Sequence, residues 1–554
     1  MSAPFANIAA HLPEMARLQP HTPAVFFPAG RDRSGRARYT HFTYSQLEAE
    51  SNRIACALEA YGIGRGVRTA LMVPPGLEFF ALTFALFKVG AVPVLIDPGM
   101  GVKNLKACIQ EAAPEAFIGI PKAHVARLLL GWGKGSLKRL LTVGKKFGWG
   151  GKTLQEISAS VPPGSPYLLA ATDAEETAAI LFTSGSTGLP KGAVYSHGNF
   201  AAQIEALRSL YDIRPGEIDL PTFPLFALFA PALGMTSVIP EMDFTRPASV
   251  DPLKIIEAIE NFGVSNMFGS PALINRVGLF GAEHGTKLPS LKRVISAGAP
   301  VPAVVLERYC AMLDPGTQIF TPYGATESLP VCSIGSAEIL RETRALTEQG
   351  RGVCVGRPVP GIELEIIAVS DAAIASWSDA LRVADGVIGE IIVKGPQVTA
   401  SYFNRPESTA LAKIDGGEKG GFFHRMGDLG YRDAVGRIWF CGRKSHRVRT
   451  SSGDLYTIPC EAIYNTHPDV FRSALVGLGA AGSQEPVICI ELESGVDKSR
   501  HGAIREELLA LGAENELTAG IKTLLFHPAF PVDIRHNAKI FREKLALWAA
   551  RELR

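Results

Sequence analysis

Short apolar runs alternate along this chain with longer stretches in which apolar residues recur every three or four positions. The short runs predict β-strands, and the longer periodic stretches predict amphipathic helices. The expected strands include residues 69–73, 92–96, 179–183 and 293–296, and the expected helices include residues 44–61 and 253–261. This alternation indicates an α/β protein of layered sheets with helices on their faces.

Other local patterns add detail to this architecture. Strand-like runs at residues 361–369 and 387–394 predict a smaller β-rich subdomain. Residues 77–96 form the most apolar stretch, but charged residues, a glycine and a proline interrupt it. It therefore predicts a buried helix followed by a strand rather than a transmembrane span. Farther along, His197 is expected to begin a helix, with Asn199 as its N-cap.

Composition places the chain among large globular proteins. Its 554 residues exceed what a single hydrophobic core holds, so two or more domains are expected. Apolar residues make up 47% and charged residues 20%, and the net charge of +2 argues against nucleic acid as the main partner. Eight scattered cysteines without a CxxC pair indicate neither a zinc site nor a disulfide framework. With no signal-peptide pattern at the start, a cytoplasmic location is expected.

Residues 131–152 form an unusual segment, rich in glycine and lysine, that also contains Trp132 and Trp149. The composition favours a solvated loop insertion. Contact with a membrane surface or with a partner protein is the alternative.

Residues 181–192, with the sequence LFTSGSTGLPKG, carry the strongest chemical signal. Glycines allow consecutive backbone N–H groups to face an anion, hydroxyls add donors, and Lys191 adds a positive charge. This pattern predicts a phosphate-binding loop that differs from the Walker A spacing. The alternative, a surface turn rich in serine and glycine, is disfavoured by the motifs downstream. The expected nucleotide-binding residues of the loop are Thr183, Ser184, Gly185, Ser186, Thr187, Gly188 and Lys191.

Further motifs follow in order. They are Tyr323-Gly-Ala-Thr-Glu327, Gly389-Glu390 with Gly395-Pro396 and Tyr402, Gly427-Asp428, Gly442-Arg443, and Lys539. Together with the loop they resemble the adenylate-forming superfamily of acyl-CoA synthetases, luciferases and adenylation domains. The resemblance implies a large N-terminal domain, residues 1–442, of layered α/β sheets with a β-rich subdomain. A small mobile C-terminal α/β domain, residues 443–554, is expected to rotate about a hinge after Arg443.

The same resemblance implies ATP and Mg²⁺ as cofactors. A carboxylic acid would attack the α-phosphate of ATP and release pyrophosphate, so cations must neutralise the approaching anions. Lys191 would hold the pyrophosphate, Thr326 would bond the α-phosphate, and Glu327 would bind Mg²⁺. Lys539 would arrive from the C-terminal domain and bridge the carboxylate and the α-phosphate.

The resemblance also assigns the nucleoside site. Asp428 would accept both ribose hydroxyls, and Arg443 would reach the ribose or the phosphates. Adenine would lie between two walls, formed by Tyr323 and Gly324 on one side and by Gly298, Ala299 and Pro300 on the other.

Residues 224–235 lie where family members place a helix that lines the acyl pocket. They are almost all apolar and include no charge to meet an amino group, which favours an alkyl chain over an amino acid. The expected pocket residues are Phe226, Phe229, Leu233 and Gly269. Plain core packing is the alternative for each of them.

Three positions depart from the acyl-CoA synthetase pattern. Ser445 stands where the hinge aspartate is common, Ala538 replaces the glycine before Lys539, and Leu455 replaces an arginine. These positions lie in the region that forms the thioester-making conformation. They put CoA transfer in doubt and leave adenylation intact.

Residues 7–15 and 535–546 resemble the β-lactone synthetases of bacterial long-chain olefin biosynthesis. This implies a long-chain 2-alkyl-3-hydroxy acid whose own 3-hydroxyl, after adenylation, closes a β-lactone and expels AMP without CoA. The implied partners are pathway enzymes, a β-lactone decarboxylase and a reductase. A long-chain fatty-acid–CoA ligase is the alternative activity, and a non-catalytic lipid-binding or scaffold protein is the alternative class.

Overall fold

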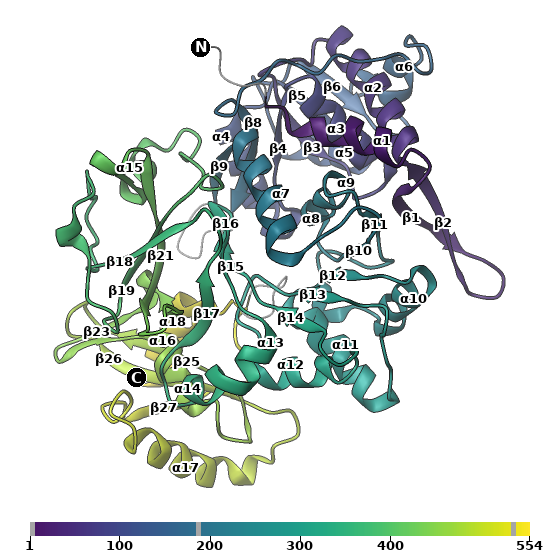
Figure 1. Cartoon of the computed structure of the whole chain (residues 1–554). Helices are drawn as coiled ribbons and strands as arrows, with labels where there is room; N and C mark the ends of the chain where they lie inside the picture. Colours follow the sequence, from purple (N-terminus) through teal and green to yellow (C-terminus); the bar gives the residue numbers. More distant parts are fainter. Residues whose placement is uncertain (1–5, 184–189, 533–538) are drawn as a thin grey trace.

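The computed structural model describes residues 6–183, 190–532 and 539–554. Within these ranges, two seven-stranded sheets with their helices form the N-terminal part, and an eight-stranded antiparallel sheet follows them (Figure 1). The chain then forms a smaller α/β unit. The layered α/β class expected from the hydrophobic pattern is confirmed.

The first sheet is parallel except at the β8–β9 pair. Its strands, in spatial order, are β7 (Lys152–Thr153), β6 (Arg139–Thr142), β5 (Ala116–Gly119), β3 (Arg68–Met72), β4 (Val92–Leu95), β8 (Thr177–Thr183) and β9 (Lys191–Ser196). Its strands alternate side chains between two faces, so Ile118 packs with α2 (Tyr44–Ala60) and α3 (Leu77–Lys88). Neighbouring Phe117 packs with α4 (Val102–Ala112) and α5 (Pro121–Leu130).

The second sheet is also parallel except for its edge pair, β1–β2. Its strands are β14 (Gln318–Phe320), β13 (Arg293–Ile295), β12 (Asn266–Phe268), β10 (Ile218–Pro221), β11 (Thr236–Val238), β1 (Pro23–Arg31) and β2 (Ala37–Thr43). Helices α10 (Pro252–Phe262), α11 (Pro271–His284) and α12 (Ala303–Cys310) pack on it. Buried residues of α3, α7 (His197–Tyr211) and α9 (Phe229–Ala232) join the two sheets in a continuous core.

The antiparallel sheet confirms the β-rich subdomain. Its strands are β15 (Tyr323–Ala325), β16 (Ser328–Ser333), β17 (Val353–Pro358), β22 (Ile438–Arg443), β21 (Phe422–Arg432), β19 (Gly389–Lys394) and β18 (Glu363–Ile367), with β20 (Lys413–Asp415) on β21. The runs expected at 361–369 and 387–394 are β18 and β19.

The chain after β22 forms a compact unit. Its strands are β23 (Val448–Thr450), β24 (Gly453–Leu455), β25 (Val470–Leu478), β26 (Glu485–Leu492) and β27 (Thr523–Phe526), and its helices are α16 (Thr457–Tyr464), α17 (His501–Ala513) and α18 (Arg542–Glu552). β22 ends at Arg443, next to the expected domain boundary, which stays a prediction. Rotation of this unit as a mobile domain stays a prediction.

Two local expectations meet different outcomes. The apolar stretch at residues 77–96 is the buried helix α3 followed by β4, and among the described residues no helix has both the length and the apolar character to span a bilayer. His197 does begin α7, but the N-cap is Ser196 rather than Asn199. The Ser196 hydroxyl accepts from the Asn199 N–H at 3.1 Å, and the Asn199 side chain accepts from the Ser196 N–H at 3.0 Å. In this reciprocal capping box, Asn199 occupies the third helical position.

Candidate active site

A cavity of about 1380 Å³ lies where the first sheet, the second sheet, the antiparallel sheet and the C-terminal unit meet. Predicted site residues from distant parts of the chain line its polar end. They are Lys191, Gly298, Gly324, Thr326, Glu327, Arg443 and Lys539. The fold therefore gathers the chemical groups that the motifs predict.

Lys191 and Glu327 are linked through Tyr402. The Tyr402 hydroxyl donates to Glu327 Oε1 at 2.6 Å, and Lys191 Nζ lies 5.1 Å from the centre of the Tyr402 ring. The backbone around Tyr402 is hydrogen-bonded to β9. The Phe403 N–H donates to the Gly192 carbonyl at 2.8 Å. Burial and the neighbouring carboxylate raise the pKa of Tyr402 above its usual range, so the hydroxyl stays a donor. The sequence motif contained Tyr402 but gave it no role.

The turn that carries Thr326 and Glu327 connects β15 to β16 and is held on two sides. The buried Tyr195 hydroxyl donates to the Thr326 carbonyl. The Glu327 carbonyl accepts from the Thr399 N–H at 2.9 Å. These bonds fix the backbone and leave both side chains at the cavity.

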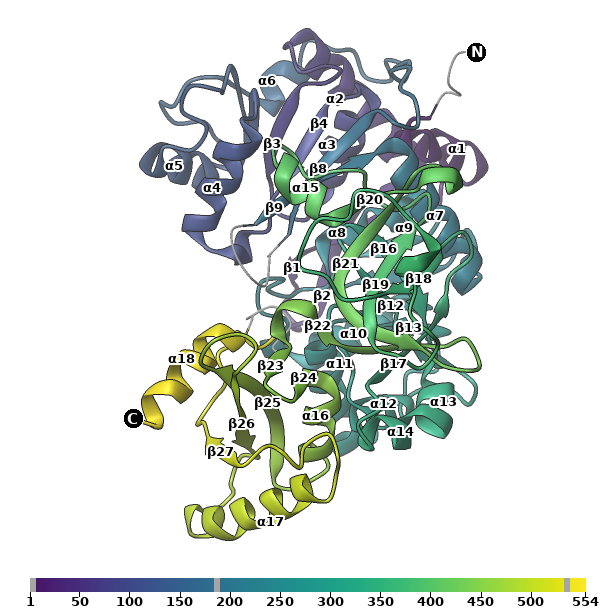
Figure 2. The ribbon, with the colours of Figure 1, turned by 90° about the vertical axis from the view of Figure 1, so that its left-hand side faces the viewer.

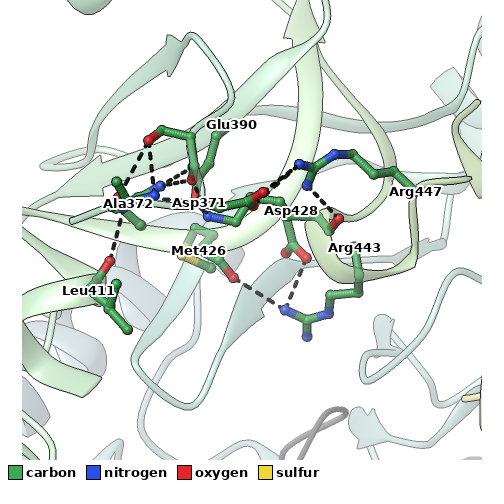
Figure 3. Close-up of polar contacts among 11 residues, drawn as sticks. Asp371, Ala372, Glu390, Leu411, Met426, Asp428, Arg443 and Arg447 are labelled. Atoms are coloured by element: carbon green, nitrogen blue, oxygen red, sulfur yellow. Dashed lines mark hydrogen bonds and ion pairs between the residues drawn. The ribbon is translucent and has the colours of Figure 1, made fainter. Parts of the chain in front are cut away.

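Asp428 forms a second polar centre beside the cavity. It pairs in register with Arg443 across the β21–β22 ladder, and Arg443 Nη1 lies 3.0 Å from Asp428 Oδ1 (Figure 3). The Tyr323 hydroxyl donates to Asp428 Oδ2 at 2.6 Å. Burial raises the pKa of Asp428, while Arg443, the Tyr323 hydroxyl and Lys539 act in the opposite direction. The C-terminal unit thus brings Lys539 within electrostatic reach of Asp428.

A buried ion cluster lies next to this centre. Glu390 is fully buried and accepts two bonds from Arg425, with the shorter, Nη2 to Oε2, at 2.6 Å. Lys444 Nζ lies 2.9 Å from Glu390 Oε1 and donates to the Ser370 carbonyl at 2.8 Å. Nearby, Arg447 pairs with exposed Asp371 at 3.0 Å (Figure 3). Lys444 directly follows Arg443, so Glu390 ties the expected hinge to the antiparallel sheet.

Apolar side chains line the rest of the cavity. Helices α3, α7, α8 (Pro224–Ala227) and α9 supply Phe79, Phe84, Phe200, Ile204, Phe226 and Phe229. The Phe226 ring meets Phe268 edge-on, with the ring centres 4.5 Å apart. This region suits a long alkyl chain.

Some predicted residues lie elsewhere. Among the described residues, Leu233, Gly269, Ala299, Pro300, Tyr323 and Asp428 do not line the cavity. Leu233 faces the core between the two sheets, since α9 is short and ends just before it. Thr183 is the last residue of β8. Ser184, Gly185, Ser186, Thr187 and Gly188 lie outside the described residues.

The donor set at Glu327 suits Mg²⁺ bound mainly through phosphate oxygens. Among the described residues, no group of three or more histidine, cysteine or acidic side chains forms a ready metal site. Magnesium commonly uses few protein carboxylates together with substrate phosphates and water. A single Glu327 carboxylate at the cavity fits that pattern.

A family model described as AMP-binding enzyme matches residues 12–403, which include the Lys191 loop, the Thr326–Glu327 turn and Tyr402. The chain belongs to the AMP-binding enzyme family. This AMP-binding enzyme is 55% identical to the olefin β-lactone synthetase of Stenotrophomonas maltophilia (strain K279a). It is 52% identical to that of Xanthomonas campestris pv. campestris. Both alignments cover 99% of this chain and 98% of the relative.

More distant relatives define the fold. A long-chain-fatty-acid–CoA ligase of Mycobacterium tuberculosis is 27% identical over 79% of this chain and 80% of its own. The solved structure of the amide bond synthetase McbA from Marinactinospora thermotolerans superposes with a TM-score of 0.79 at 24% identity. That superposition covers 98% of this AMP-binding enzyme and 99% of the other chain. The adenylate-forming fold expected from the motifs is confirmed.

Proposed function

We propose that this protein is an ATP-dependent β-lactone synthetase that acts on a long-chain 2-alkyl-3-hydroxy acid in olefin biosynthesis. The observation that carries the proposal is the 52–55% identity to two olefin β-lactone synthetases along nearly the whole chain. Identity to the fatty-acid–CoA ligase is about half as high and covers less of the chain.

In the first half-reaction, the acid's carboxylate attacks the α-phosphorus of ATP and pyrophosphate leaves. Lys191 neutralises the leaving pyrophosphate, and Thr326 bonds the α-phosphate. Glu327 is the carboxylate that would hold Mg²⁺, which neutralises phosphate charge when bound. Lys539 approaches from the C-terminal unit and lowers the repulsion between the two reacting anions.

The nucleoside is held by the centre around Asp428. The Asp428 carboxylate accepts the ribose hydroxyls, and Tyr323 and Arg443 fix its orientation through the bonds described above. Gly298 and Gly324 line the cavity and border the adenine. Ala299 and Pro300 directly follow Gly298 in the chain.

In the second half-reaction, the 3-hydroxyl oxygen attacks the acyl carbon, the bond to AMP breaks, and a four-membered lactone forms. The hydroxyl proton leaves with the AMP phosphate, which is a suitable acceptor. Because the nucleophile and the acyl carbon belong to one molecule, their effective concentration is high and no CoA is required.

The chemistry of substrate and product also defines partners. A reductase that makes the 3-hydroxyl supplies the substrate, and a decarboxylase converts the lactone to the olefin. We propose that the protein works with both enzymes in the cytoplasm.

Product analysis by NMR tests the function directly. The protein is incubated with ATP, Mg²⁺ and a long-chain 2-alkyl-3-hydroxy acid, with and without CoA. We expect a β-lactone in both samples. A thioester formed only with CoA would instead identify an acyl-CoA ligase and make Ser445 and Leu455 neutral variation. Absence of pyrophosphate release with every acid would favour a non-catalytic protein.

Asp428→Asn is expected to weaken ATP binding by about ten- to a hundred-fold, because hydrogen bonds to a charged acceptor contribute roughly 1.5–3 kcal/mol. Equilibrium binding of ATP measures the loss. Asp433→Asn is the matched control, since Asp433 pairs with Arg437 at 2.8 Å on the same hairpin. Thermal melting of both variants separates lost binding from lost folding. Unchanged affinity in a folded Asp428→Asn protein would contradict the ribose role.

A further inference from the structure

Exposed apolar side chains gather on α4, on α5 and in the loop between β6 and β7. Leu129 is 80% exposed and Phe147 is 59% exposed, and Val102, Val125 and Leu128 are about half exposed. On α5, Val125 stands three and four positions before Leu128 and Leu129, so the three side chains share one face. Figure 2 shows α4 and α5 side by side at the outer edge of the N-terminal part. This face has the composition of a contact surface.

Positive charge concentrates in the same region. Residues 99–153 contain ten lysines and arginines but two glutamates, whereas the whole chain carries +2, so the remainder is net acidic. Both glutamates are in ion pairs, Glu111 with Arg405 at 2.6 Å and Glu115 with Lys138 at 2.8 Å. The exposed lysines of the two helices are Lys103, Lys106 and Lys122. The region therefore presents cations together with aliphatic side chains.

The cavity of the candidate active site reaches this surface. Met100, Leu105 and Trp132 belong to the core between α4, α5 and the first sheet, and they line the cavity. Lys122 and Ala123, at the start of α5, also line it. Lys122 is also exposed, so its side chain lies between the cavity and the surface, on the helix that carries the apolar face.

We propose that α4, α5 and the loops on either side of β6, residues 131–138 and 143–151, form a membrane-contacting surface that holds the protein on an anionic bilayer. A long-chain acid would then pass from the bilayer into the cavity beside Lys122. The proposal rests on the long-chain substrate proposed above. Lysines near an anionic lipid surface are attracted to headgroups, and exposed aliphatic side chains insert at the boundary of the acyl chains.

A lipid surface fits these features better than an acidic protein does. An acidic partner would account for the lysines, but it offers no reason for exposed aliphatic side chains on the same helix as a residue that lines an apolar cavity. A bilayer accounts for both, because an acid with two long chains partitions into lipid and leaves it most easily through an apolar opening.

Co-sedimentation of the full-length protein with vesicles tests the proposal. We expect binding to vesicles of phosphatidylcholine mixed with phosphatidylglycerol, weak binding to phosphatidylcholine alone, and weakening by salt. Lys103→Glu/Lys106→Glu is expected to reduce binding to the mixed vesicles by about tenfold or more. Leu128→Ser/Leu129→Ser, which removes apolar side chains but no charge, is expected to reduce it by a similar factor.

Leu253→Ser/Leu547→Ser is the matched control, because these leucines are exposed on α10 and α18 instead. It should bind vesicles like the unmodified protein. Loss caused by the lysine variant alone would mean that headgroup charge holds the protein without insertion of the α5 face, and it would overturn the proposal. Equal binding to both vesicle types would also overturn it. Pyrophosphate release with a long-chain 2-alkyl-3-hydroxy acid dispersed in a neutral detergent, without vesicles, is expected to be the same in all variants. Its absence in the unmodified protein would contradict the proposed function separately from vesicle binding.

Discussion

Replacing Lys539 by alanine is expected to reduce pyrophosphate release by about two to three orders of magnitude, the usual loss for a group that stabilises developing charge. Lys539 lines the polar end of the cavity and acts electrostatically on buried Asp428. Its neighbour Ile540 pairs with Val532 in an isolated antiparallel bridge. In the proposed adenylation, a cation at this position would lower the repulsion between the carboxylate and the α-phosphate.

ATP binding should remain largely intact in Lys539→Ala, because Lys191, Asp428 and Arg443 are unchanged. Measuring ATP affinity and pyrophosphate release on the same protein separates binding from chemistry. Lys544→Ala is the matched control, since Lys544 lies in the same unit with Nζ 4.6 Å from the centre of the Phe541 ring. Near-normal pyrophosphate release in Lys539→Ala would refute its role in adenylation.

The sequence predicts the elements well where burial follows a local period. Residues 44–61 correspond to α2, and residues 69–73 correspond to β3, because each pattern repeats within a few residues. The capping of α7 shows the limit of such reasoning. Ser196 and Asn199 are both good N-cap residues, and only their reciprocal bonds decide which one occupies the cap.

Side-chain direction and long-range contacts are harder to predict. Phe226, Phe229 and Leu233 are all apolar and close in sequence, but Leu233 turns into the core while the two phenylalanines line the cavity. Short helices such as α8 and α9 give too few turns to define a face. The bond between Tyr402 and Glu327 joins residues 75 apart in the chain, so no local pattern contains it.

Glu390 is the clearest case of a role that emerges only from the fold. The motif that contains it is visible in the sequence, but its partners Arg425 and Lys444 come from β21 and from the segment after β22. All three line the cavity. The carboxylate neutralises two cations, one of which directly follows the expected domain boundary.

Glu390→Gln is therefore expected to lower the free energy of unfolding by about 3–5 kcal/mol, because it leaves buried Arg425 without its counter-ion. Glu390 and Arg425 are 0% and 4% exposed, so water cannot solvate the guanidinium group that loses its counter-ion. The midpoint of urea unfolding, compared with that of the unmodified protein, measures the change. The amide keeps the shape of the side chain, so the loss reports charge rather than packing.

Asp371→Asn is the matched control for this prediction. Asp371 also contacts two cations of the same region, Arg447 at 3.0 Å and Arg449 at 3.4 Å, but its side chain is 59% exposed. Exposed pairs contribute about 0–1 kcal/mol, since solvent screens them. A large shift for Glu390→Gln beside a small one for Asp371→Asn would establish that burial makes this ion cluster stabilising. Equal shifts would mean that Glu390 does not anchor the segment after β22.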